Sequence, residues 1–321
     1  MKRAIRSLVF AMVLFSFLPL QARAAEGLVP VGKIIGLQLR DDTVTVAAYD
    51  DLLGQQAKKA GLKIGDEIVT VNGAAIDCAE DVRTALGSGG EAELMVRRGG
   101  KLNTLHITPE QTSEGPRLGV YLRQGIAGIG TVTFYDPETG VFGTLGHGVS
   151  DPRGNLLQMT QGNAYEARIL SVKKGKSGEP GQLKGTADAA STFGNLLRNT
   201  PQGVFGITKQ GWKGESIPVA SYGEIHTGAA AIRSTVSGDT AQDYSVEILK
   251  IYPEDRADGR NFLIKVVDPA LLSATGGIVQ GMSGSPIIQD GKLIGAVTHV
   301  LVNDPTTGYG IFIENMLDAA G

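Results

Sequence analysis

Short apolar runs, separated by glycine and polar turn residues, follow one another along most of the chain. Residues 33–39, "KIIGLQL", and 43–49, "TVTVAAY", are rich in β-branched residues and predict strands. Between residues 52 and 87, two stretches have the spacing of short helices, and a strand ending in an Asn-Gly turn lies between them. Beyond residue 118, short strands alternate with glycine-rich loops. The pattern predicts a mainly β protein with few helices.

Composition supports this prediction and limits the classes of function. Glycine accounts for 45 of the 321 residues, and 42% of the residues are apolar. A chain of this length has room for two domains, each with its own core. The net charge is −3 and no dense Lys/Arg block follows the first residues, so nothing indicates a nucleic-acid partner. Cys78 is the only cysteine, which excludes a disulfide within the chain.

The first 24 residues predict export across the cytoplasmic membrane. Lys2, Arg3 and Arg6 precede the apolar run "SLVFAMVLFSFLPL", which is shorter than a bilayer-spanning helix. The small residues around Ala22-Arg23-Ala24 are typical of a signal-peptide cleavage site. Residues 1–24 are therefore predicted to be a signal peptide or, if they are not cleaved, a membrane anchor.

The order of strands and helices in residues 27–108 resembles that of a PDZ domain, and "AGLKIGDEIVTVNG", residues 60–73, carries most of the resemblance. The polar segment "PEQTSEGPR", residues 109–117, is then the linker to a second domain over residues 118–321.

PDZ domains bind a peptide as an added strand, and backbone N–H groups of the preceding loop hold its terminal carboxylate. Here the resemblance implies a carboxylate loop around Gly32 and Lys33. The peptide-pairing strand would then contain Ile35, Gly36, Leu37 and Leu39. The alternative is a domain that only packs against the rest of the protein.

Near the carboxyl end, Ser283 lies in "GMSGSP", residues 281–286, between two apolar strands. Glycine at position 281 lets the chain turn so that its N–H and that of Ser283 point the same way. Two such donors could hold an oxyanion, which makes Ser283 a candidate nucleophile. A purely structural turn explains the same residues.

A serine nucleophile needs a base, and the chain has four histidines. His147 follows an apolar strand in "GVFGTLGHGVSD", and its flanking glycines leave the imidazole ring accessible. His106 lies in a predicted strand with a solvated face, and His226 has no distinguishing neighbours. His299 ends the strand after the serine, where a structural role or a place in the substrate cleft is expected.

The acid that would orient the base is not determined by the residues alone. Four aspartates precede a proline, an arrangement common at turns and helix starts: Asp136, Asp151, Asp268 and Asp304. In particular, "DPALLSATGG" is typical of a helix that begins with Asp268 as its N-cap and stops at glycine.

The blocks "GIGTVTFYDPETGVFGTLGHGVSD" and "TGGIVQGMSGSPIIQDGKLIGAVTHVLVNDPTTGYGIFIENML" closely resemble the SpoIVB peptidases, the stage IV sporulation protein B serine proteases. The resemblance implies a Ser-His-Asp triad with His147 as general base, Asp268 as its orienting acid and Ser283 as nucleophile. It further implies a trypsin-like double β-barrel, oxyanion donors at Gly281 and Ser283, and chemistry without a metal or organic cofactor. Met282 carries no charge, so activation by an ion pair of a new amino terminus with the residue before the serine is excluded.

The same resemblance implies a biological role. Such enzymes are exported into the space between the forespore and mother-cell membranes. There they cleave a regulatory partner of an intramembrane protease, which leads to activation of a late sporulation sigma factor. Self-cleavage near the amino terminus and PDZ-mediated recognition belong to this role, as does possible membrane association through the first residues.

Two other functions compete with this one. A PDZ-bearing adaptor with an inactive peptidase domain is one, and the presence of His147, Asp268 and Ser283 argues against it. A general envelope quality-control protease is the other, but such proteases usually carry their PDZ domains after the protease domain.

Overall fold

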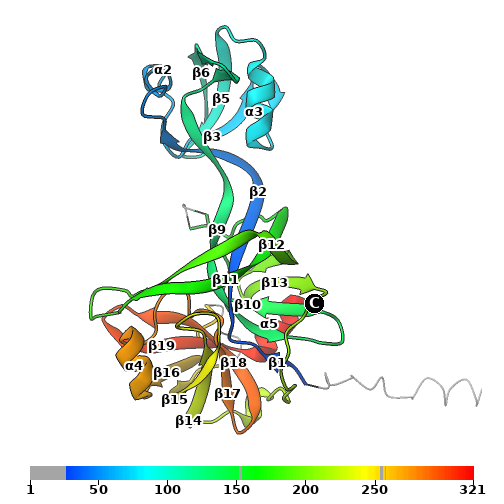
Figure 1. The fold of residues 1–321 in the computed structure, drawn as a ribbon, viewed down its shortest axis with the longest axis vertical. Helices are drawn as coiled ribbons and strands as arrows, with labels where there is room; N and C mark the ends of the chain where they lie inside the picture. The colour runs from blue at the N-terminus through cyan, green and yellow to red at the C-terminus, as the bar shows by residue number, and fades with distance from the viewer. Residues whose placement is uncertain (1–26, 152–153, 254–255, 257) are drawn as a thin grey trace, which may run out of the picture.

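The computed structural model describes residues 27–151, 154–253, 256 and 258–321. The predicted signal peptide or anchor, residues 1–24, lies outside these residues. No helix among the described residues has the length and apolar character needed to span a membrane. As the sequence predicts, the protein is mainly β, with a lower body of two halves and a smaller unit at its top (Figure 1).

The carboxyl-terminal half is a closed six-stranded barrel in the order β14-β15-β16-β19-β18-β17. Buried and exposed side chains alternate along its strands: in β16, Ile264 and Val266 are buried whereas Lys265 between them is exposed. Phe262 and Phe312 pack edge to face in its interior, with ring centroids 4.5 Å apart. Helix α5 (Ile313–Ala320) follows the last strand. The strands are β14 (Gly228–Ser234), β15 (Gln242–Ile251), β16 (Phe262–Val266), β17 (Pro286–Gln289), β18 (Lys292–Leu301) and β19 (Asp304–Phe312).

The amino-terminal half of the body is a second sheet with its own core. Pairing passes from β2 to β9, then through β10, β13, β12 and β11, and returns to β2. Ile35, Leu37 and Leu39 from β2 pack there with Val132 and Phe142. The strands are β1 (Val29–Pro30), β2 (Ile34–Tyr49), β9 (Val120–Tyr135), β10 (Val141–Thr144), β11 (Gln161–Lys173), β12 (Gln182–Thr200) and β13 (Gly203–Thr208).

The smaller unit, residues 44–122, is inserted between strands β2 and β9 of this half and is called the distal unit. Strands β2 and β9 both run from the body into it (Figure 1). It has a separate apolar core, and a buried Asp66 that pairs with Arg98 at 2.6 Å. Its elements are α2 (Gln55–Lys59), β3 (Glu67–Val71), β4 (Ala74–Ala75), α3 (Ala79–Leu86), β5 (Ala92–Arg98), β6 (Lys101–Ile107), β7 (Glu110–Thr112) and β8 (Gly115–Arg117).

This arrangement differs from the predicted division at residues 108 and 117. Residues 28–39 contribute to the cores of the body instead of that of the distal unit. The pattern of "KIIGLQL" correctly predicts a strand, but it does not say which sheet contains that strand. The predicted linker, residues 109–117, is largely the hairpin β7–β8, and its Pro116 is buried.

The prediction of a peptide-binding groove at residues 32–39 is wrong, because the strand pairings of β2 leave no room for a peptide there. Residues Ile35 to Leu39 pair with β9 on one edge and with β11 on the other, so they have no free edge for a peptide. Gly32 has a left-handed φ of +68°, and a Cβ there would lie 2.7 Å from the carbonyl oxygen of Arg233. This turn packs against the barrel, where its carbonyl accepts the hydroxyl of Thr235 at 3.0 Å.

Candidate active site

Ser283 lies in a tight loop between Gln280 and β17. Gly281 and Gly284 on its two sides have φ values of +100° and +95°, which side chains disfavour. A Cβ at Gly284 would lie 2.0 Å from the carbonyl oxygen of Thr131, so glycine lets the loop approach the amino-terminal half. Met282, in contrast, is completely buried in the barrel core. The loop therefore turns Met282 inward and leaves Ser283 facing outward.

The other half of the body holds this loop from across the interface. The N–H of Thr131 in β9 donates to the carbonyl of Ser283 at 3.1 Å, and its hydroxyl donates to the carbonyl of Gly281 at 2.7 Å. The hydroxyl of Thr133 donates to the carbonyl of Gly284 at 2.8 Å. These bonds use the carbonyl groups of the loop. The N–H groups of Gly281 and Ser283 have no acceptor among the residues that the structure describes.

His147 belongs to the amino-terminal half, in the loop that follows β10. Leu145 and Gly146 take left-handed φ values of +70° and +68°, and this unusual pair of turns directs the loop towards the barrel. A Cβ at Gly146 would lie 2.9 Å from the side chain of Thr298 in β18. Nδ1 of His147 lies 2.9 Å from the carbonyl oxygen of Gly148. Since a carbonyl only accepts, Nδ1 carries the proton in the neutral ring and Nε2 is free to accept one.

A single side chain, Asn199 at the end of β12, holds the segment that follows His147. Its amide group donates to the carbonyls of Val149, at 2.8 Å, and Leu157, at 2.9 Å. Its amide oxygen accepts from the N–H of Val149 at 2.9 Å. Asn199 lies 52 positions from His147, with no motif around it, so the sequence alone did not indicate it.

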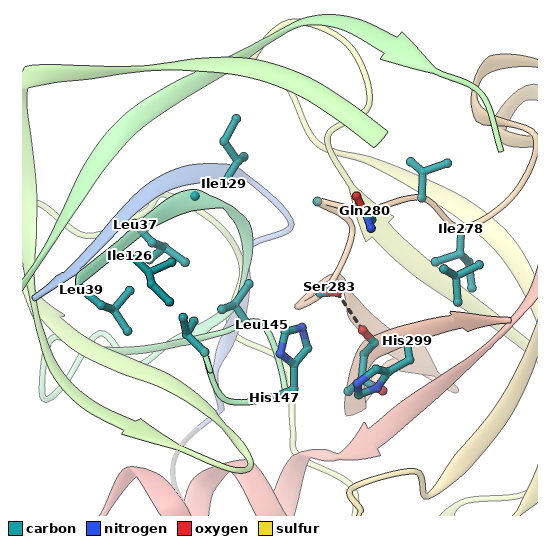
Figure 2. A pocket seen from close by; sticks show the side chains of 16 residues that line it. Leu37, Leu39, Ile126, Ile129, Leu145, His147, Ile278, Gln280, Ser283 and His299 are labelled. Atoms are coloured by element: carbon teal, nitrogen blue, oxygen red, sulfur yellow. Dashed lines mark hydrogen bonds between the residues drawn. The ribbon is translucent and has the colours of Figure 1, made fainter. Parts of the chain in front are cut away.

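The two loops meet at a cleft of about 420 Å³ between the halves of the body. Figure 2 shows His147 and Ser283 facing this cleft, with His299 beside them. The hydroxyl of Ser283 donates to the carbonyl of Thr298 at 2.7 Å, so in this conformation its proton does not go to His147. The sixteen residues that line the cleft include no carboxylate, ammonium or guanidinium group: Leu37, Leu39, Ile126, Gly128, Ile129, Leu145, His147, Val149, Ile278, Val279, Gln280, Gly281, Ser283, Thr298, His299 and Val300.

Both histidines of the cleft favour the neutral form. Burial lowers the pKa of His147, and the hydrogen bond with Gly148 opposes this only in part. Burial, followed by the charges of His147 and Arg260, lowers the pKa of His299 to about 4. A neutral His147 at physiological pH is the form that can accept a proton from a serine.

Asp268 does not join His147 and Ser283, which corrects the acid of the predicted triad. It is the N-cap of helix α4 (Pro269–Thr275), where its Oδ1 accepts from Ala270 at 2.9 Å and Leu271 at 3.0 Å. The N–H groups of Leu271, Ser245 and Ala270 lower the pKa of its carboxyl group. The described bonds of its carboxylate thus go to backbone N–H groups at the helix start and at Ser245 in β15, and it does not line the cleft.

The other three Asp-Pro aspartates also bond within their own turns. Asp136 accepts from Thr139, Asp151 from Asn155, and Asp304 from Thr306 and Thr307. Of the other two histidines, His106 lies in β6 of the distal unit. His226 lies on the barrel surface, where its Nε2 is 2.8 Å from Asp290.

Comparison with known proteins assigns the family. A sequence model of the SpoIVB peptidase S55 family matches residues 114–317, more than half of the chain. The chain therefore belongs to the SpoIVB peptidase family and is a serine peptidase, as its motifs predicted. The match starts at the end of the distal unit and leaves out residues 27–113, including strand β2 of the body.

None of the curated proteins matches the chain. Among solved structures, the crystal structure of the Rv3671c protease in its inactive form is similar, with a TM-score of 0.34. The two chains are 14% identical, and the match covers 61% of this chain and 85% of that chain.

Proposed function

We propose that this peptidase cleaves peptide bonds with Ser283 as nucleophile and His147 as general base. The observation that carries the proposal is that the two loops, 136 positions apart in the sequence, face one cleft from opposite halves of the body. Rotation of the Ser283 side chain away from Thr298 directs its hydroxyl to Nε2 of His147. The oxygen then attacks the substrate carbonyl while His147 takes the proton.

The rest of the reaction uses groups of the same loops. The free N–H groups of Gly281 and Ser283 stabilise the negative oxygen of the tetrahedral intermediate. His147 returns its proton to the leaving amine. It then takes a proton from water, which attacks the acyl-enzyme, and passes that proton to the oxygen of Ser283. The carbonyl of Gly148 keeps the His147 ring in the tautomer that this sequence of steps requires.

The arrangement of the body supports a trypsin-like double barrel. The amino-terminal half has a closed ring of strand pairings, and the carboxyl-terminal half is a closed barrel. The base comes from the first and the nucleophile from the second, with the cleft between them, as in proteases of that class.

The cleft favours an uncharged, apolar peptide segment as substrate. Leu37, Leu39 and Ile126 form one wall, and Ile278 stands on the other (Figure 2). A charged side chain entering this cleft would lose its water without gaining an ionic partner. Substrate proteins are therefore cut where apolar residues flank the bond.

We further propose that the distal unit is a PDZ domain whose peptide groove lies between β9 and α3. Within the described residues, Val120 to Gln124 pair with β2 along one edge only. Helix α3 contacts both β8 and β9. The turn before this strand, with Gly119 at a φ of +69°, then serves as the carboxylate loop. The same strand β9 continues to Thr131 and Thr133, which hold the nucleophile loop.

The biological role follows the family. The enzyme is exported to the space between the forespore and mother-cell membranes and cleaves a regulatory partner of an intramembrane protease. It also cleaves itself near the amino terminus, and the first residues give it possible membrane association. The PDZ domain directs recognition of the partner or of the enzyme's own segment.

Labelling of the purified protein with a fluorophosphonate probe, followed by peptide mapping, tests the chemistry. The label should be found on Ser283 and be absent from Ser283→Ala. An unlabelled wild-type protein that still binds peptides would favour the adaptor function instead.

Peptides with apolar residues on both sides of the bond should be cut faster than the same peptides with Asp or Lys there. The reverse preference would contradict the substrate class.

A further inference from the structure

The feature that the proposed mechanism leaves unused is a second histidine in the cleft. The rings of His299 and His147 lie with their centroids 5.2 Å apart and their planes tilted by 38° (Figure 2). The two residues come from different halves of the body, His147 from the loop after β10 and His299 from β18. Their contact therefore depends on the same interface that forms the active site.

One nitrogen of His299 is in an unusual state. Its Nδ1 is buried and has no hydrogen-bond partner among the residues that the structure describes. Buried polar atoms are nearly always paired, so an unpaired one beside a reacting group calls for a functional explanation. Because the ionisable groups around it are His147, Arg260 and Asp258, and burial dominates, His299 stays neutral and retains a lone pair that can accept a hydrogen bond.

His147 has no charged partner among the residues that the structure describes. Asp268 caps α4, and the hydrogen-bond partner of the ring within these residues is the backbone carbonyl of Gly148. When His147 takes the proton of Ser283, its ring becomes positively charged in a cleft without any carboxylate. A second acceptor near the ring would stabilise this charged form.

We propose that His299 is a positioning residue for His147: its neutral ring packs against the base, and the dipole of this polar ring stabilises the imidazolium formed during acylation. The proton of Ser283 moves to Nε2 of His147, the proton on Nδ1 stays on that ring, and no proton passes to His299. Strand β18 contacts both His147 and Ser283. His299 packs against the ring of His147, and the carbonyl of the preceding residue, Thr298, accepts the hydrogen bond from the hydroxyl of Ser283. This inference rests on the proposed roles of His147 and Ser283.

Three variants separate positioning from packing. His299→Phe keeps a ring in the cleft and removes the acceptor, whereas His299→Gln keeps an acceptor without the imidazole. His226→Phe, at the exposed histidine on the barrel surface, is the matched control. The measurements are kcat and KM for an apolar fluorogenic peptide across pH, labelling by the fluorophosphonate probe, and thermal unfolding.

We expect His299→Phe to lower kcat about 10- to 100-fold, the size of one lost interaction between a polar group and a charge, with KM nearly unchanged. The acid limb of its kcat/KM profile should move to lower pH, because His147 loses a group that favours its protonated form. His299→Gln should recover most of the rate and the position of the limb, and His226→Phe should equal the wild type.

Two results would overturn the inference while leaving the proposed function intact. The first is wild-type kcat and an unmoved acid limb in a folded His299→Phe protein. The second is an equal loss in the Phe and Gln variants with an unmoved limb, which would assign His299 a packing role. Failure of the probe to label Ser283 in the wild-type protein would instead contradict the proposed function itself.

Discussion

The loop that carries Ser283 and the loop that carries His147 both turn through left-handed glycines, Gly281 and Gly146, but they are held in place differently. The Ser283 loop is bound by its own barrel and by two threonines of β9. The segment after His147 depends mainly on three hydrogen bonds from one side chain, Asn199.

This difference indicates where the active site is sensitive to change. Several independent bonds hold the nucleophile loop, so the loss of one leaves its shape in place. The loop of His147, the proposed base, has one main clamp, and the described lining of the cleft has no carboxylate, so the position of His147 depends on few contacts. Substitutions that act only through position should therefore have larger effects on the His147 side of the cleft than on the Ser283 side.

The largest effect is expected from the nucleophile itself. Ser283→Ala should lower kcat by about 10⁶-fold and abolish self-cleavage, because no other group can form the acyl-enzyme. Ser285→Ala is the matched control, since Ser285 is buried and its hydroxyl donates to the hydroxyl of Ser234 at 3.0 Å. It should keep most of the activity. Continued self-cleavage by purified Ser283→Ala protein would refute the assignment.

Removing the clamp of the other loop should have the next largest effect. Asn199→Ala should lower kcat about 100-fold, the cost of a base displaced by roughly 1 Å. Because it leaves buried groups unpaired, it should also lower the free energy of unfolding by about 1–3 kcal/mol. Steady-state kinetics measure the change in kcat, and urea unfolding measures the change in the free energy of unfolding. The control, Thr133→Val, removes one bond to the Ser283 loop and should reduce kcat much less; a larger loss there would reverse the comparison.

The pH dependence tests the environment of the base. Since burial lowers the pKa of His147, the acid limb of kcat/KM should lie below the ordinary histidine value of about 6.5. His147 thus stays neutral, and the enzyme active, as pH falls through that value. Its burial also makes stability decrease once pH falls below the unfolded-state pKa, because the unfolded chain binds the proton more readily. An acid limb above 6.5 would show that a negative group reaches His147.

The smallest effect is expected at Asp268. Asp268→Asn keeps the helix cap, so the free energy of unfolding and kcat should both stay close to the wild type. Asp268→Ala should lower the free energy of unfolding by about 1 kcal/mol without a specific loss of kcat. A loss of about 10⁴-fold in Asp268→Asn, the effect expected of a triad acid, would show that its carboxylate reaches His147 in the working enzyme.

Much of this protein could be predicted from residues that are close in the sequence. The mainly β fold, helix α3, the Asn72-Gly73 turn and the cap at Asp268 all follow from local patterns. The glycines around His147 and Ser283 also indicate exposed loops without knowledge of the fold. The family model covers both of these blocks.

The assignments that needed correction all concern partners that are distant in the sequence. The pattern around Ile35, Leu37 and Leu39 predicts a strand, but its neighbours, β9 and β11, start more than 80 positions away. A local pattern therefore could not show that this strand has no free edge. The same holds for Asn199 and His299, whose importance comes from contacts with the His147 loop and not from any motif.

The sequence by itself determined which segments form strands and where the chain turns, and it indicated Ser283 and His147 as the candidates for the active site. These properties depend on backbone preferences and side-chain periodicity over a few residues. Only the tertiary structure decided which strand edge stays open and that Asp268 does not line the cleft. It also decided that a neutral histidine and a backbone carbonyl surround the base. Those outcomes depend on how two separately folded halves pack, and the packing brings together groups that are more than a hundred positions apart.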